Sequence, residues 1–198
     1  MSEFTEAYYL RTKNRDDVIE LIKQANMKGY VFPEKNGWVT FVVNGEFSSA
    51  PEQLIKSNQG ILVHFENAED HGWKFEIYKK DKLSVYYECS IEHCSMEDFD
   101  MNDLEMYTPS LAYNVKLDSP VLAEVLREID EDNRIRAVIY LCLEDAKNKS
   151  NEPIVTSYHY AEKMGFFFFD WISYHYIELD HERTGKILYG DVPLLLVK

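Results

Sequence analysis

The sequence predicts an α+β fold. An antiparallel sheet carries two helices on one face and is followed by a mainly helical carboxy-terminal part. In the first ninety residues, β-rich runs and apolar patterns at helical spacing follow the order β-α-β-β-α-β-β-β. Tight-turn signals between several runs favour antiparallel pairing. Beyond residue 118, apolar residues recur mainly at helical spacing.

The composition indicates a folded chain with its own core. The 198 residues are 45% hydrophobic and 14% aromatic, which argues against disorder. This length fits one domain or two small lobes. We expect an α+β lobe at 1–95, an acidic connector at 96–118 and a mainly helical lobe at 119–198, packed on the first.

The first predicted elements are a strand over 5–11 and a helix over 15–26. Asn14 can cap this helix, because its side chain can accept a hydrogen bond from a free backbone N–H. The helix then buries one stripe: Val18, Leu21, Ile22 and Ala25. Strands over 29–33 and 38–43 follow, joined by Asn36-Gly37, a pair that tolerates the positive φ angles of a tight hairpin turn.

A short helix and three further strands complete the amino-terminal lobe. Ser49 and Glu52 have the spacing of a capping box, which predicts a helix to about residue 58. The strands are expected at 61–66, 73–78 and 82–89. A three-residue loop at 79–81 keeps apolar residues on one face, and the register it predicts pairs Trp73 with Tyr87, Phe75 with Val85 and Ile77 with Leu83.

Two segments of this lobe resemble each other. Leu21-Ile22-Lys23 precedes Gly37-Trp38, and Leu54-Ile55-Lys56 precedes Gly72-Trp73. Each segment has the order α-β-β. An internal duplication and a chance likeness both explain these few matches.

The carboxy-terminal part begins with the clearest helix, which Ser119-Pro120 opens. The region 135–143 fits either a helix or a buried strand, and the helix is favoured because the pattern continues to residue 147. Another helix runs from Pro153 to Gly165, a residue suited to a left-handed cap. The aromatic stretch 166–179 leaves helix and strand both open, and 187–197 is expected to be extended.

Charge and composition exclude several classes of function. Lys and Arg number 21 against 35 Asp and Glu, a net charge of −14. Without a basic cluster, nucleic acid and anionic membranes are poor partners. No apolar run approaches the roughly 20 residues of a membrane span, and the amino terminus lacks the features of a secretory signal. Three cysteines at irregular spacing fit a reducing, cytoplasmic location.

Two groups of histidines and carboxylates are candidates for metal or catalytic sites. The first holds His64, Glu66, Glu69, Asp70 and His71, and the second holds His175, Glu178, Asp180 and His181. Neither matches a known ligand spacing, so we predict no metal at either and no cofactor. Cys89, His93 and Cys94 lack the second ligand pair of a structural zinc site. Phosphate-binding glycine loops and a nucleophile elbow are also missing.

Acidic residues without neighbouring cations stand out in two windows. The acidic window at 83–115 has no Lys or Arg, and 164–182 likewise has acids but no cation. Tyr and Trp are good interface anchors, and acidic charge speeds the encounter with a basic partner. The alternative explanation is ordinary solubility with a large aromatic core. The candidate binding residues are Glu97, Asp98, Asp100, Asp103, Glu105, Trp171 and Tyr174.

The sequence therefore favours a protein-binding or inhibitor module, similar in kind to immunity proteins, for a basic partner. That comparison is an analogy with other acidic antagonists. The alternative is a metal-assisted hydrolase whose histidines and carboxylates meet only in three dimensions. A pocket in which His64 or His175 faces two carboxylates would favour the hydrolase. A flat acidic and aromatic surface would favour the binder.

Overall fold

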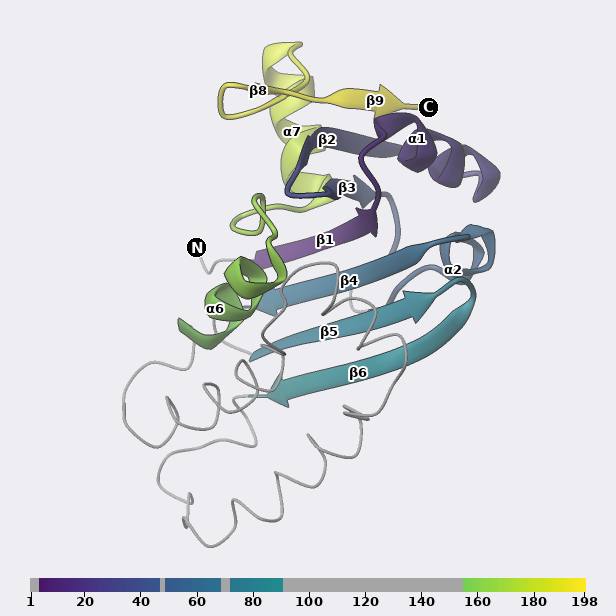
Figure 1. Ribbon diagram of the computed structural model, residues 1–198. Coiled ribbons are helices and arrows are strands. Elements are labelled where there is room, and N and C mark those ends of the chain that lie inside the picture. The colour runs from purple at the N-terminus through teal and green to yellow at the C-terminus, as the bar shows by residue number, and fades with distance from the viewer. Residues whose placement is uncertain (1–3, 47–48, 69–71, 91–154) are drawn as a thin grey trace, which may run out of the picture.

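The computed structural model describes residues 4–46, 49–68, 72–90 and 155–198. It shows an α+β fold around a seven-stranded antiparallel sheet (Figure 1). The strand order is β6-β5-β4-β1-β3-β2-β9. The strands are β1 (Phe4–Arg11), β2 (Gly29–Lys35), β3 (Trp38–Val43), β4 (Ile61–Ala68), β5 (Gly72–Lys79), β6 (Lys82–Ser90) and β9 (Leu195–Val197). The α+β class, the antiparallel sheet with two helices on one face and the order of the first eight elements are confirmed. The mainly helical carboxy-terminal part stays a prediction.

Several predictions fall outside the described residues. These are the connector at 96–118, the helices expected near 119–129 and 135–143, and the candidate binding acids between 97 and 105. The division of the chain into two lobes therefore stays a prediction.

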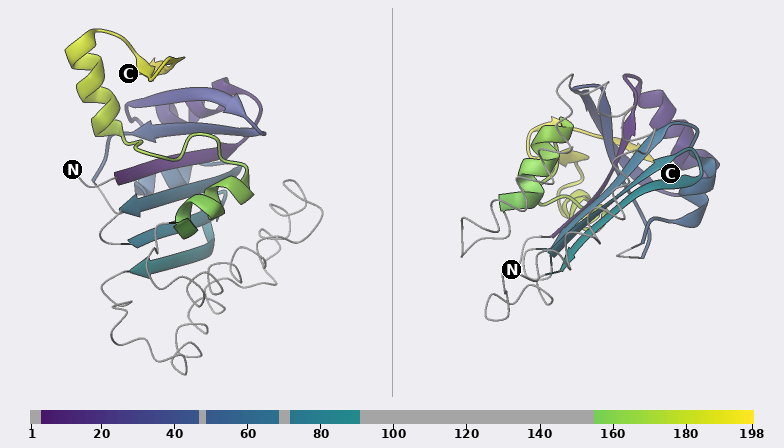
Figure 2. Two further views of the ribbon diagram at one scale, coloured as in Figure 1. Left: turned by 90° about the vertical axis from the view of Figure 1, so that its left-hand side faces the viewer. Right: turned by 60° about the horizontal axis from the view of Figure 1, so that its bottom comes forward.

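Helices α1 (Arg15–Gln24) and α2 (Glu52–Ser57) cover one face of the sheet (Figure 2). The Asn14 side chain caps α1, as predicted, by accepting a hydrogen bond from the Asp16 backbone N–H at 3.1 Å. The predicted stripe of α1 and Leu54 of α2 pack against alternate residues of the central strands. We call this side the α1/α2 face.

The opposite face is covered by helix α6 (Val155–Met164) and the irregular segment 165–173 (Figure 2). Side chains of the sheet donate hydrogen bonds to carbonyl groups of this segment and of the last residue of α6. Tyr9 Oη donates to the Phe168 carbonyl at 2.7 Å, and Trp38 Nε1 donates to the Met164 carbonyl at 2.9 Å. Gly165 ends α6 with φ 79°, the left-handed conformation that its position predicted.

Aromatic rings dominate the core on this second face. Phe166 stacks on Tyr9 with ring centres 3.7 Å apart and meets Trp38 edge-on at 5.2 Å. Tyr160 stacks on Phe75 at 4.1 Å. The carboxy-terminal segment and the amino-terminal sheet thus share one apolar core.

The end of the chain returns to the sheet. Helix α7 (Tyr174–Thr184) begins at Ser173, whose Oγ accepts from the Tyr176 backbone N–H, and ends at Gly185 with φ 68°. The short strands β7 (Leu188–Tyr189) and β8 (Val192–Pro193) pair with each other, and β9 then pairs with β2. The aromatic stretch left open by the sequence is therefore irregular at first and helical from residue 174.

Two sequence predictions are wrong in detail. Helix α2 is capped at Pro51 without a side-chain hydrogen bond, so Ser49 does not form the capping box. The β5–β6 register is shifted by two residues, pairing Trp73 with Cys89 and Phe75 with Tyr87. The turn is tighter than expected, with Lys80 at φ 54°, and the register shifts at a bulge between Ile77 and Tyr78.

The two α-β-β segments are both present but are not placed equivalently. In the first, the second strand (β3) lies beside β1, whereas in the second the first strand (β4) does. The duplication stays a prediction. Among the described helices, none combines the length and the apolar character needed to cross a membrane.

Candidate functional site

A shallow hollow lies on the outer side of α7. Its lining residues come from one face of the helix and from the loop before it: Trp171, Tyr176, Leu179, Asp180, Glu182 and Arg183. We call these six residues the α7 surface. Its volume of about 730 Å³ is in the range of small-molecule sites, but it is widely open to solvent. This openness suits a docking surface for another macromolecule better than an enclosed ligand pocket.

Trp171 has an unusual backbone conformation for a bulky residue. Its φ is 51°, and its side chain is 42% exposed. Its neighbours explain how this conformation is held, because the carbonyl of buried Ile172 accepts from the Glu6 backbone N–H at 2.7 Å. Buried Ser173 then begins α7. A left-handed conformation at such a residue costs about 1–3 kcal/mol.

The two predicted aromatic binding residues do not share one surface. Trp171 lies on the α7 surface, near Tyr176. Tyr174 instead packs against Tyr30, and its hydroxyl donates to Glu178 at 2.8 Å. Burial and the neighbouring Glu178 carboxylate raise the pKa of Tyr174. Tyr174 therefore joins α7 to the sheet.

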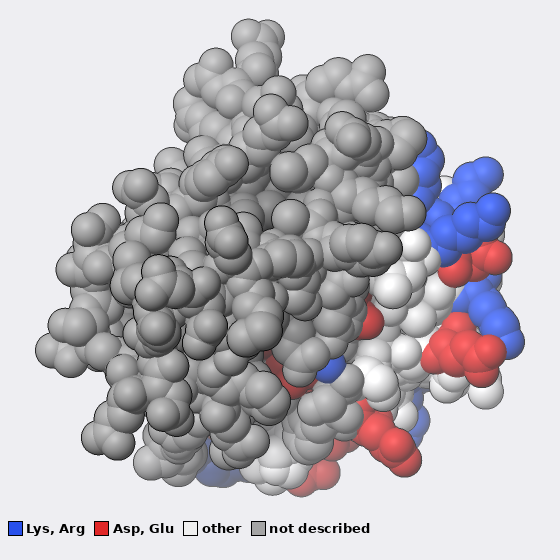
Figure 3. Space-filling view, turned by 90° about the horizontal axis from the view of Figure 1, so that it is seen from below, with Lys and Arg blue, Asp and Glu red and all other residues white. Residues whose placement is uncertain are grey.

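The charge of the α7 surface is mixed but mainly acidic. Asp180 and Glu182 are exposed, and Arg183 donates to Asp180 at 2.8 Å. An exposed pair of this kind contributes little to stability and can be exchanged for other partners. Elsewhere, on the underside of the molecule, acidic and basic side chains lie side by side where the surface is described (Figure 3).

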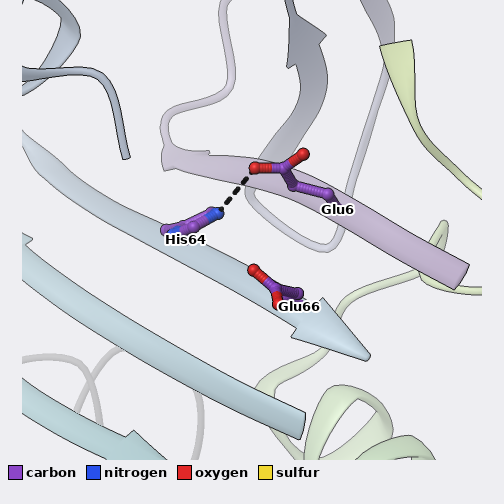
Figure 4. A group of neighbouring side chains, drawn as sticks. All are labelled: Glu6, His64 and Glu66. Atoms are coloured by element: carbon purple, nitrogen blue, oxygen red, sulfur yellow. Dashed lines mark ion pairs between the residues drawn. The ribbon is translucent and has the colours of Figure 1, made fainter. Parts of the chain in front are cut away.

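A second candidate lies on the α1/α2 face. His64 of β4 is fully buried and lies between two carboxylates, with Nδ1 2.9 Å from Glu76 Oε2 and Nε2 3.4 Å from Glu6 Oε1 (Figure 4). Its ring stacks on Tyr8 with centres 4.6 Å apart. Glu66 lies next to the same ring, and Lys74 Nζ is 3.3 Å from Glu66 Oε2. We call Glu6, His64, Glu66, Lys74 and Glu76 the His64 cluster.

The charges of the His64 cluster shift the pKa values within it. Burial alone lowers the pKa of His64, but the carboxylates of Glu6 and Glu76 outweigh burial and raise it. The Glu76 carboxyl is also partly buried, yet its contact with His64 lowers its pKa. The pKa of Tyr8 is raised by burial and by Glu6 and the other carboxylates. The two carboxylates therefore favour the charged form of the His64 ring.

The remaining sequence candidates do not converge in the described residues. His175 is exposed, and His181 Nδ1 is 3.0 Å from the Tyr30 hydroxyl. Positions 69–71 and Cys94 lie outside the described residues, as does His93.

No family model, curated protein or solved structure matches this chain. The functional argument therefore rests on the chain's own geometry.

Sequence reasoning missed residues at both sites. Glu6 and Glu76 were not connected with His64, because they lie on neighbouring strands and only strand pairing brings them together. Tyr176, Leu179 and Arg183 recur at helical spacing, a signal that becomes readable once this stretch is assigned as a helix.

Proposed function

We propose that this protein binds a basic protein partner through the α7 surface, as an inhibitor or immunity-like module does. The observation that carries the proposal is exposed Trp171, held in a left-handed conformation beside Leu179, which is 49% exposed. Tryptophan is among the residues most enriched at the energetic centre of interfaces. A tryptophan and a leucine that both leave this much apolar surface in solvent suit an interface.

The preference for a basic partner rests on charge. The chain carries a net charge of −14, and Asp180 and Glu182 line the α7 surface. Acidic rim residues accelerate association with a basic protein and disfavour acidic competitors. The acidic window is proposed to add to this steering through Glu97, Asp98, Asp100, Asp103 and Glu105.

The test is affinity capture from native extract with the wild-type chain and two matched variants. Trp171→Ala removes the proposed anchor, and Phe167→Ala removes another exposed aromatic residue, at 56% exposure, that is not part of the α7 surface. We expect the wild type and Phe167→Ala to retain the same basic protein and Trp171→Ala to lose it. Affinity for the purified partner should fall by about 2 kcal/mol or more in Trp171→Ala.

Salt dependence and charge removal give a second test. Neutralising Glu97, Asp98, Asp100 and Asp103 together should mainly slow association, and the effect should fade at high salt. Equal affinity of Trp171→Ala and wild type, or binding only to acidic proteins, would contradict the proposal.

The His64 cluster favours the alternative function, a metal-assisted hydrolase, in one respect, since it places one imidazole between two carboxylates. However, the side chain of His64 has no exposed surface. A catalytic base must reach its substrate within hydrogen-bond distance. We therefore propose binding as the function and consider the His64 cluster separately.

A further inference from the structure

Three potential metal ligands meet on the α1/α2 face. One ligand atom each from Glu6, His64 and Glu66 lies within 4.8 Å of the others. Figure 4 shows Glu6 reaching from β1 and Glu66 extending along β4, both toward the same edge of the His64 ring. Sequence spacing could not reveal this group, because β1 and β4 are far apart in the chain and pair only in the sheet.

The orientation of His64 is the second observation that points to a ligand. Nδ1 is 2.9 Å from Glu76 Oε2, so the carboxylate fixes the proton on Nδ1. Nε2 is buried and lies 3.4 Å from Glu6 Oε1, within ion-pair distance, but it makes no hydrogen bond within the described part of the chain. Metal-bound histidines almost always donate their other ring N–H to a carboxylate or carbonyl group, which orients the ring. Glu76 occupies that place here.

The separation of the ligand atoms also suits a small divalent ion. Zinc bonds of roughly 2.0–2.2 Å in a tetrahedral site place neighbouring ligand atoms about 3.4 Å apart. His64 Nε2 and Glu6 Oε1 are 3.4 Å apart. The Glu66 ligand atom lies within 4.8 Å of the other two, so it must move closer to complete the site.

Lys74 competes with a metal ion for the Glu66 carboxylate, since Lys74 Nζ is 3.3 Å from Glu66 Oε2. A carboxylate has two oxygens, so Glu66 can keep Lys74 on one and bind a metal through the other. The proton on His64 Nε2 is the second competitor, and it must leave before a metal binds.

We propose that Glu6, His64 and Glu66 form a structural site for one zinc-type divalent cation, with Glu76 as the positioning residue of His64. An imidazole nitrogen with carboxylate oxygens suits zinc, whereas magnesium and calcium prefer oxygen ligands alone. Full burial of His64 gives the ion a structural role, in which it connects β1 to β4. This inference is independent of the function proposed for the α7 surface.

The test is calorimetric titration of the full chain with Zn²⁺ after removal of metal by a chelator. We expect one ion per chain, proton release on binding and tighter binding as the pH rises. Glu6→Gln and Glu66→Gln should each weaken binding at least about tenfold, and Glu76→Gln by about 10–100-fold. These near-isosteric changes carry the test, because replacement of fully buried His64 risks unfolding the chain. His175→Gln, at an exposed position on α7, is the matched control and should bind as wild type does.

Cobalt substitution separates this site from the cysteines. Co²⁺ bound by His64 and two carboxylates should lack the near-ultraviolet thiolate charge-transfer band that Cys89 or Cys94 would produce. A Cys89→Ser, Cys94→Ser variant should keep its zinc stoichiometry. Absence of stoichiometric binding, a thiolate band, or unchanged affinity in folded Glu6→Gln would each overturn the proposal. None of these outcomes affects partner capture through Trp171.

Discussion

Replacing Phe166 by Ala tests whether the segment after α6 is part of the main core. Phe166 is 3% exposed, stacks on Tyr9 at 3.7 Å and meets Trp38 edge-on at 5.2 Å. It also approaches Phe65 and Tyr160. Removal of the ring leaves a cavity in the core, so the free energy of unfolding should fall.

The expected loss is about 3–5 kcal/mol, the usual range for a buried Phe→Ala change. The upper half of this range is favoured, because the ring contacts other aromatic rings as well as aliphatic groups. The loss is a large part of a typical total stability of about 5–15 kcal/mol. With a urea m-value of about 2 kcal/mol per molar, the unfolding midpoint should fall by about 2 M.

The adjacent residue provides a matched control. Phe167 is 56% exposed, and its ring lies 5.3 Å from Lys35 Nζ. An exposed cation–π contact contributes about 0.5–1 kcal/mol, so Phe167→Ala should cost no more than that.

Urea unfolding followed by circular dichroism and by tryptophan fluorescence measures both variants. The two signals should report one transition if sheet and segment unfold together. A loss below about 1 kcal/mol for Phe166→Ala, or equal losses in the two variants, would refute the placement of this segment against the sheet.

Three further predictions follow from single contacts. In Gly29→Ala, the added Cβ lies 2.6 Å from the Val42 carbonyl oxygen and should cost about 1–3 kcal/mol in thermal unfolding. Gly45→Ala, whose nearest atom is 3.4 Å away, should change stability by less than about 1 kcal/mol, and equal effects would contradict the packing. Ser173→Ala removes the cap of α7 and should cost about 1 kcal/mol in urea, whereas Ser173→Thr keeps an acceptor and should lose less. With chelator present, the raised pKa of His64 means that folding takes up a proton. The stabilisation that His64 contributes should therefore be complete below about pH 6.5. It should be lost as the pH rises through the raised pKa of His64 in the folded chain. Glu76→Gln should reduce this pH dependence, and an unchanged pH profile would show that Glu76 does not hold the imidazolium.

Local patterns in the sequence predicted most elements of the sheet. The helix after Asn14, the Asn36-Gly37 turn and the end of α6 at Gly165 all follow from residues within a few positions of each other. Their side chains act directly on the backbone, by capping a free N–H or tolerating a positive φ. These elements can therefore be predicted from a few neighbouring residues in the sequence.

Longer-range features needed the tertiary structure. The stretch after Gly165 has no clear period, because its rings fill spaces in a core set by β1, β3 and β4 and do not form a regular face. The β5–β6 register depends on a bulge that the alternation of apolar residues did not reveal. Alternation without a bulge favoured the three-residue loop, whereas the observed bulge allows a tighter turn with Trp73 and Phe75 still buried.

The two candidate sites also combine features that are local in the sequence with features that only the tertiary structure shows. The sequence by itself identified Trp171 as a candidate anchor, since residue type and neighbouring charge are local properties. It also grouped His64 with Glu66, but their spacing predicted no metal there. Only strand pairing brought Glu6 and Glu76 to the two nitrogens of His64. Only the packing of residues 172 and 173 left Trp171 exposed in a left-handed conformation. Both depend on contacts between residues distant in the chain, which are decided by burial over the whole fold and not by the residues nearby.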